Sequence, residues 1–223
     1  MRLRNIPGAK EEIKESIFVV QDPEAWRGHW RERAGMDGSL YIEVGMGKGR
    51  FIMEQARLNP GIIHVGIEMY DSVLLRAVQH RVAEEDKDGP FHNLFFIRMD
   101  ARQLADVFAP GEADRLYLNF SDPWPKARHA DRRLTSARFL ERYTHVLRQN
   151  GELIFKTDNQ ELYDFSLETA RNAPAWELIA STMDLHADPV LSVGNVMTEY
   201  EEKFSAQGNP ICMMKLKLLK PSA

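Results

Sequence analysis

A short run of polar and proline residues, Ser121-Asp-Pro-Trp-Pro-Lys126, follows an apolar segment and has the composition of a rigid catalytic rim. Proline at 123 biases Asp122 toward an extended backbone, and proline at 125 does the same for Trp124. A carboxylate on such a stiff segment is positioned before substrate binds. We therefore predict that Asp122 faces the reacting atoms, whereas Trp124 either stacks on a nucleobase or fills the core.

Three further acidic residues stand at or near the ends of other apolar segments. Glu43 precedes a glycine-rich turn, Glu68 follows the segment 62–67, and Asp100 follows the segment 94–97. Strand ends form the ligand-binding edge of a doubly wound sheet, and glycines let backbone N–H groups approach a ligand there. We expect one nucleoside pocket, lined by Glu43, Gly45, Gly47, Gly49, Glu68 and Asp100.

The glycine spacing indicates which nucleoside binds. The turn reads G-x-G-x-G, which differs from the G-x-G-x-x-G of dinucleotide-binding proteins. Glu43 would repel a pyrophosphate, but it suits the ammonium and sulfonium groups of S-adenosylmethionine. Glu68 would accept hydrogen bonds from the ribose hydroxyls. Asp100 would accept from the adenine amino group, although capping a helix over residues 102–108 is the commoner role for a lone aspartate. The predicted cofactor is S-adenosylmethionine.

A basic segment follows the rim. Between Lys126 and Arg142 the sequence has six basic and two acidic residues, while the whole chain carries a net charge of −4. Isolated charge runs are usually solvated helix faces. Exposed charges act over only about 8 Å at physiological salt, so a local basic stripe on an acidic protein can still bind phosphates. Its position next to a rigid carboxylate favours a nucleic-acid substrate.

Short apolar runs alternate with segments of helical period, which predicts an α/β fold. Strands are expected at 39–44, 62–67, 94–97, 115–119, 152–156, 176–180 and 211–219, and helices at about 50–58, from an N-capping Asp71 onward, at 135–147 and at 160–171. We predict a doubly wound, Rossmann-like methyltransferase sheet that is mostly parallel. Residues 38–223 are expected to form a single methyltransferase domain. Residues 1–37, which include the basic Arg2 and Arg4, are expected to form an N-terminal arm that is mobile or orders on RNA.

Composition excludes several classes of protein. A single cysteine, Cys212, excludes an intrachain disulfide, and the seven histidines show no pair at ligand spacing, so no metal site is expected. The N-terminal segment lacks the apolar run of a signal peptide, and no stretch approaches the ~20 apolar residues of a membrane helix. We expect a cytoplasmic protein that binds neither a membrane nor a metal.

The sequence resembles the bacterial tRNA (guanine-N7-)-methyltransferases over nearly its whole length. The matching segments are Arg2–Asn5, Glu43–Gly49, Leu116–Lys126, Arg128-His129, Arg132–Leu134, Phe139-Leu140, Phe155–Asn159 and Gly194–Glu201. The run from Leu116 to Lys126 is the most specific of them. One departure is Ala127, which stands where the family usually has a second lysine and which predicts one phosphate contact fewer.

This resemblance implies the roles of individual residues. Glu43, Glu68, Asp100 and Asp122 would line the S-adenosylmethionine site, and the last strand would be antiparallel. The substrate would be a guanine in the tRNA variable loop, and the partner would be tRNA, bound by a monomer or a homodimer. The expected substrate-binding residues are Lys126, Arg128, His129, Arg132, Arg133, Asp158, Thr198, Glu199, Tyr200 and Glu201.

Guanine N7 carries an in-plane lone pair and no proton, so its methylation requires alignment rather than a strong base. The expected catalytic residue is Asp122, which would orient the base and offset the positive charge arriving on the purine. Glu199 or Glu201 would accept from guanine N1–H and its exocyclic amine. If the segment 198–201 is extended, Thr198 and Tyr200 face one side and the two glutamates the other.

Three other functions fit the same fold. A methyltransferase acting on small molecules would need a lid, and the sequence shows no long insertion that could form one. A nicotinamide-dependent oxidoreductase is disfavoured by the glycine spacing and by Glu43. An RNA-binding protein without catalysis would be expected to have lost Asp122 or the glycine turn, and both are present.

Overall fold

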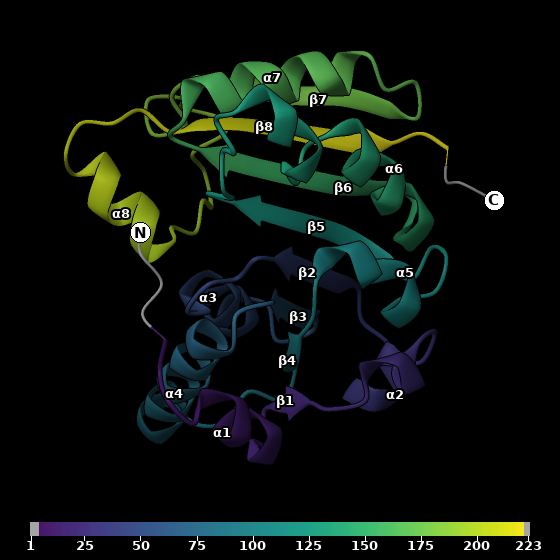
Figure 1. Cartoon of the computed structure of the whole chain (residues 1–223), viewed down its shortest axis with the longest axis vertical. Coiled ribbons are helices and arrows are strands. Elements are labelled where there is room, and N and C mark those ends of the chain that lie inside the picture. The colour runs from purple at the N-terminus through teal and green to yellow at the C-terminus, as the bar shows by residue number, and fades with distance from the viewer. Residues whose placement is uncertain (1–4, 221–223) are drawn as a thin grey trace. The chain divides into compact units, whose positions relative to one another are not determined.

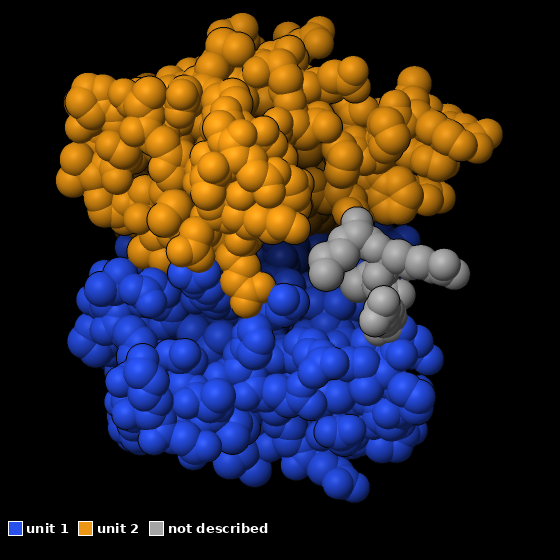
Figure 2. Space-filling model, turned by 90° about the vertical axis from the view of Figure 1, so that its left-hand side faces the viewer, with its two compact units in different colours: residues 1–108 blue, residues 109–223 orange. Residues whose placement is uncertain are grey.

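The computed structural model describes residues 5–220, which form two compact units. Among the described residues they span 5–108 and 109–220 and are coloured blue and orange in Figure 2. The predicted division into an arm (1–37) and one domain (38–223) stays a prediction.

The first unit contains a four-stranded parallel sheet in the order β1-β4-β3-β2. Its strands are β1 (Val19–Val20), β2 (Leu40–Val44), β3 (Ile63–Glu68) and β4 (Leu94–Arg98). Its helices are α1 (Ala9–Glu15), η1 (Pro23–Trp26), α2 (Trp30–Ala34), α3 (Arg50–Leu58), α4 (Asp71–Asp88), η2 (Ala101–Gln103) and α5 (Leu104–Val107). Helices α3 and α4 pack on the sheet (Figure 1), because their apolar residues lie on one face.

The start of the chain is part of this unit from residue 5 onward. Helix α1 packs on α4, and β1 extends the sheet by pairing with β4. Trp30 is fully buried, and its indole N–H donates to the carbonyl of Val107 at 3.1 Å. Arg2 and Arg4, the basic residues predicted for the arm, lie outside the described residues.

The second unit has a mixed sheet in the order β5-β6-β8-β7. Strands β5 (Ala113–Asn119) and β6 (Leu147–Thr157) are parallel, whereas β8 (Cys212–Leu218) runs antiparallel to both β6 and β7 (Trp176–Thr182). The antiparallel last strand is therefore confirmed. The helices of the second unit are η3 (Ala127–Arg132), α6 (Ala137–Val146), α7 (Gln160–Arg171) and α8 (Glu199–Ser205). Helices α6 and α7 lie side by side against the sheet (Figure 1).

The boundary of α4 differs from the prediction that Asp71 caps this helix. Tyr70 occupies the N-cap position without a side-chain cap, and Asp71 is the first helical residue. The Asp71 carboxylate instead accepts from Nε of Arg98 at 2.8 Å. An acidic group in the first turn still stabilises the helix through its dipole, so the residue type was informative and its exact position was not.

Candidate active site

The glycine turn between β2 and α3 has a left-handed backbone at three positions. Gly45, Gly47 and Gly49 have φ of 76°, 59° and 80°, values that side chains with a Cβ rarely adopt. A Cβ on Gly45 or Gly47 would meet no other atom within 4 Å, so both face open space. A Cβ on Gly49 would instead make ordinary van der Waals contact with Ala77, so its positive φ rather than its packing favours glycine there. The turn thus presents bare backbone to a ligand at its first two glycines.

Glu68 ties this turn to the end of β3. The side chain is buried, and its Oε2 accepts from the N–H of Gly47 at 3.1 Å. Its Oε1 accepts from the N–H groups of Met69 at 2.9 Å and Tyr70 at 3.0 Å. Oε1 thus accepts from two donors and uses both of its lone pairs, so a ribose hydroxyl would have to donate to Oε2.

Glu43 is the second buried carboxylate at this end of the first unit. It is 1% exposed and lies opposite Gly66 in the pairing of β2 with β3. Gly66 has a packing role, since a Cβ there would collide with the sulfur of Met46 from the glycine turn. Two buried carboxylates on adjacent strands, next to a turn with open space above it, suit a ligand that carries positive charge.

Asp100 follows β4 and caps η2, the alternative that the sequence left open. Its Oδ1 accepts from the N–H of Arg102 at 2.8 Å. The guanidinium of Arg102 also donates to both carboxylate oxygens, at 2.7 to 3.0 Å, and this hydrogen bonding raises the pKa of Arg102. These four bonds engage both lone pairs of each oxygen, so the predicted contact between Asp100 and an adenine amino group would require Arg102 to give up one of its bonds.

The rim Ser121–Lys126, hereafter the lip, follows β5 and differs from the prediction at Trp124. Trp124 has φ of 42°, and Phe120, the residue before the lip, has φ of 52°. The expected extended backbone at Trp124 is therefore wrong. Asp122 lies exposed between these two left-handed residues.

Arg133 is hydrogen-bonded to the lip backbone at Trp124 and at the residue before it. Its Nε donates to the carbonyl of Pro123 at 2.9 Å, and its Nη2 donates to the carbonyl of Trp124 at 3.2 Å. The Arg132 guanidinium lies 5.0 Å from the Trp124 ring centroid, and the His129 ring meets that ring edge-on at 5.7 Å. These contacts counteract the local preference that proline imposes on the preceding residue.

The predicted phosphate-binding residues thus divide into two groups. Lys126, Arg128 and Arg132 are exposed on or next to η3. His129 and Arg133 are half-buried and turn toward the lip, and the Arg133 guanidinium also lies 4.3 Å from the ring centroid of Phe165 on α7. The Arg133 guanidinium donates to two lip carbonyls, and its predicted part in binding the substrate stays a prediction.

Residues 198–201 do not form the extended segment that was considered. Thr198 is the N-cap of helix α8, and its Oγ1 accepts from the N–H of Glu201 at 2.9 Å. Glu199 and Tyr200 are the first residues of this helix. The proposed alternation of side chains therefore does not apply, because a helix and not a strand sets their directions.

Glu201 is fully buried, and its carboxylate contacts other parts of the same unit. Oε2 accepts from Nζ of Lys156 at 2.5 Å, and Oε1 accepts from Nδ2 of Asn195 at 2.7 Å and lies 3.2 Å from Nε2 of His186. Lys156 is also buried and donates to the carbonyl of Val196 at 2.8 Å. With these partners Glu201 ties α8 to the end of β6, and the prediction that Glu199 or Glu201 reads guanine stays a prediction.

Lys156 lies in the matching segment Phe155–Asn159, and the sequence predicts no function for it. A lysine inside the apolar run of β6 was nevertheless a signal, since lysine is almost never fully buried without a partner. The identity of the partner was not available from spacing, because Glu201 is 45 positions away.

Tyr200 and Asp158, both expected to contact substrate, lie together. The Tyr200 hydroxyl donates to Oδ2 of Asp158 at 3.2 Å. Burial raises the pKa of Tyr200, and the charge of Asp158 raises it further. The Tyr200 ring lies 4.9 Å from the ring of Phe120 and 4.1 Å from that of Phe204, measured between centroids. Helix α8 therefore contacts the residue that precedes the lip.

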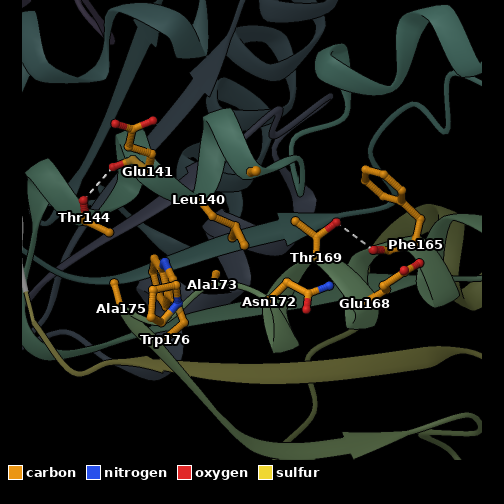
Figure 3. A pocket seen from close by; sticks show the side chains of 12 residues that line it. Leu140, Glu141, Thr144, Phe165, Glu168, Thr169, Asn172, Ala173, Ala175 and Trp176 are labelled. Atoms are coloured by element: carbon orange, nitrogen blue, oxygen red, sulfur yellow. Dashed lines mark hydrogen bonds between the residues drawn. The ribbon is translucent and has the colours of Figure 1, made fainter.

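A separate cavity of about 570 Å³ opens between α6, α7 and the start of β7. Leu140, Phe165 and Trp176 are among its lining residues (Figure 3), and Glu141 and Glu168 add carboxylates. None of the predicted site residues lines it.

In the part of the chain from 5 to 220, no group of three or more histidine, cysteine or acidic residues could hold a metal ion. No helix described there is long and apolar enough to cross a membrane.

Comparisons with known proteins agree with the resemblance. A family model described as "Putative methyltransferase" matches residues 37–214. A tRNA (guanine-N(7)-)-methyltransferase from Lachnoclostridium phytofermentans is 53% identical over 211 residues, which cover 95% of this chain and 95% of that protein. The chain belongs to the tRNA (guanine-N(7)-)-methyltransferase family. Another member, from Enterococcus faecalis, is 44% identical over 98% of this chain and 99% of its own length.

Solved structures show the fold of this tRNA (guanine-N(7)-)-methyltransferase family member. The 16S rRNA methyltransferase KamB has a TM-score of 0.65 at 15% identity, over 86% of this chain and 93% of that one. A variant of the 16S rRNA (adenine(1408)-N(1))-methyltransferase from Catenulisporales acidiphilia, solved with cosubstrate SAM, has a TM-score of 0.58 at 17% identity, over 92% and 95%. The predicted doubly wound, Rossmann-like methyltransferase fold is confirmed.

Proposed function

We propose that this protein transfers a methyl group from S-adenosylmethionine to N7 of a guanine in the variable loop of tRNA. The observation that carries this proposal is the 53% identity, over nearly the full chain, to a tRNA (guanine-N(7)-)-methyltransferase. The lip supports it further, because it holds an exposed carboxylate next to exposed basic residues. We also place the activity in the cytoplasm, with tRNA as the partner of a monomer or homodimer.

The cofactor would be held by residues of the glycine turn and the strand ends. S-adenosylmethionine supplies an electrophilic methyl group on a sulfonium. The buried Glu43 would attract its positive charge, Gly45 and Gly47 leave space for it, and Glu68 would accept from the ribose. Asp100, already hydrogen-bonded to Arg102, would accept from the adenine amino group. These roles follow from the negative charge and the hydrogen-bond acceptors of the three carboxylates.

On the substrate side, Asp122 would orient guanine so that N7 lies in line with the methyl carbon and sulfur. Its charge would offset the positive charge that develops on the purine. Lys126, Arg128 and Arg132 would bind phosphates. Asp158 and Thr198, with Tyr200 and Glu199 beside them, would contact the substrate. Because Glu201 is committed to Lys156 and Asn195, Glu199 is the residue that we propose reads guanine.

A methylation assay tests the proposal directly. The protein is incubated with an unmodified tRNA transcript and radiolabelled S-adenosylmethionine, and the digested nucleosides are separated. We expect labelled N7-methylguanosine from this transcript and none from a matched transcript whose variable-loop guanine is replaced by adenine. Label on another base, or on the control transcript, would assign a different target. No label at all would refute the activity.

A further inference from the structure

We propose that Arg133 is a positioning residue that holds the lip, and with it Asp122, in the conformation needed for methyl transfer. This inference rests on the proposed function and assigns Arg133 a part other than phosphate binding. The charge pattern of the sequence predicts phosphate binding along the basic segment that includes Arg133. The structure instead separates Arg133 from its exposed neighbours Arg128 and Arg132.

The first step is the backbone of Trp124. A φ of 42° is uncommon for a side chain of this size, and the following Pro125 disfavours the helical backbone further. Such conformations persist only where the surrounding structure holds them. The contacts around Trp124 should therefore include a group whose removal lets the backbone relax toward the extended form.

The second step is the shortage of backbone donors in the lip. Pro123 and Pro125 have no N–H, so this segment cannot be fixed by a regular ladder of backbone hydrogen bonds. Its carbonyl groups can still accept, and the planar guanidinium of Arg133 reaches two consecutive ones, at Pro123 and Trp124. Stacking of the guanidinium on Phe165 anchors this donor to helix α7.

The third step is the position of Asp122 between two fixed points. At the upstream end, the N–H of Phe120 donates to the carbonyl of Lys156 at 2.8 Å, which attaches the lip to β6. At the downstream end, Arg133 provides the attachment through Trp124. Loss of Arg133 would free one of the two ends. The Asp122 carboxylate would then sample several positions, and the alignment on which the reaction depends would suffer.

Enzyme kinetics separate this role from phosphate binding. Arg133→Ala is expected to lower kcat on the order of 10- to 100-fold, because small misplacements of a catalytic group are costly. The slope of tRNA affinity against salt should stay at the wild-type value. Arg128→Ala is the matched comparison, and it should reduce that slope by about one unit, as the loss of one phosphate contact does. Arg133→Lys, which keeps the charge and can donate to one carbonyl, should recover part of kcat.

A spectroscopic measurement tests the attachment of the lip by Arg133, hereafter the tether, and needs neither tRNA nor cofactor. The chain has four tryptophans, so 5-fluorotryptophan labelling gives a small set of ¹⁹F signals, and Trp124→Phe identifies that of Trp124. We expect this signal to shift or broaden in Arg133→Ala and to stay in place in Arg128→Ala. If wild-type protein makes no N7-methylguanosine, the proposed function fails, while the ¹⁹F spectrum still decides whether Arg133 holds the lip.

Two results would overturn the inference. One is an Arg133→Ala protein that keeps its kcat and loses about one unit of salt slope, which would make Arg133 a phosphate contact. The other is an unchanged Trp124 signal in that variant. If Arg133→Ala does not fold, Arg133→Met, which keeps a long side chain and removes its donors, replaces it in both measurements, and wild-type values in both would equally refute the inference.

Discussion

Asp122 combines two properties that are seldom found together in one side chain. It is exposed, and the residues on either side of its short segment, Phe120 and Trp124, have constrained left-handed backbones. The constrained backbone limits where the carboxylate can lie. This combination suits a group that stabilises charge in a transition state without moving to do so.

Replacement of Asp122 by alanine tests this role. We expect kcat for tRNA methylation to fall about 100-fold, the size of effect seen when one charge-stabilising group is removed. Cofactor affinity, measured by calorimetry with S-adenosylhomocysteine, should change much less. Asp122→Asn retains the shape and removes the charge, so comparison of the two variants separates electrostatics from orientation. Equal losses in kcat and cofactor affinity would instead make Asp122 a cofactor ligand only.

The positions of single residues could be predicted from the sequence where the backbone or the site accepts only a few residue types. The spacing was enough to place Gly45 and Gly47 in a tight turn and the carboxylates near strand ends, because few residue types satisfy those positions. The partners of these side chains could not be predicted. The two bonds from Arg133 to lip carbonyls depend on the path of the chain after η3, and no local pattern shows it.

At the scale of elements, helix α8 is attached to β6 by a buried ion pair. Lys156 is 3% exposed and Glu201 is 0% exposed, and their charged atoms lie 2.5 Å apart. Loss of one partner from such a pair leaves an uncompensated charge in the interior. The position of α8, and with it that of Thr198 and Tyr200, should therefore depend on both residues.

Lys156→Met should lower the free energy of unfolding by about 3–5 kcal/mol, the usual cost of breaking a buried pair. The double variant Lys156→Met/Glu201→Met should be more stable than the single one, because it leaves no lone charge. Chemical denaturation followed by circular dichroism measures both. Lys215→Met is the matched control, since Lys215 pairs with the half-buried Glu152 in the same sheet and should cost only about 0–1 kcal/mol. Equal losses for Lys156→Met and Lys215→Met would show that burial of the first pair has no energetic effect.

Most strands and the longer helices could be predicted, since periodicity and glycine or proline stops mark them. Helix α8 was missed although its sequence carries a start signal. Thr198 followed three residues later by Glu201 has the form of a capping box, and acidic residues fill the first turn. Alternation within four residues is a weak signal, and the capping signal should have outweighed it.

At the scale of the whole molecule, β1, α1 and α2 show where sequence reasoning stops. These elements are short, and their burial depends on distant partners, as in the bond from Trp30 to Val107. The charge pattern likewise predicted a basic surface segment but not the hydrogen bonds that its residues make, such as those of Arg133. The burial of one histidine leads to a prediction for the stability of the whole chain.

His64 lies in the interior of β3, with Nδ1 2.9 Å from the carbonyl of Ile62 and its ring edge-on to Tyr41. Burial lowers the pKa of His64 from 6.5 to about 4, against an opposing contribution from the Ile62 carbonyl. In the unfolded chain this histidine takes up a proton near pH 6.5, whereas in the folded chain it stays neutral down to about pH 4. The unfolded state therefore binds more protons in this window, so stability falls as the pH falls.

The expected loss is about 1.4 kcal/mol per pH unit, or about 3 kcal/mol between pH 6.5 and pH 4. Urea denaturation at a series of pH values measures it for the wild type, for His64→Asn and for His92→Asn, a control at an exposed histidine of the same unit. Carboxylates also titrate below pH 5, so the informative quantity is the difference between wild type and variant. That difference should shrink toward low pH for His64→Asn and stay constant for His92→Asn. A constant difference for both variants would mean that the buried ring is protonated in the folded protein as readily as in water.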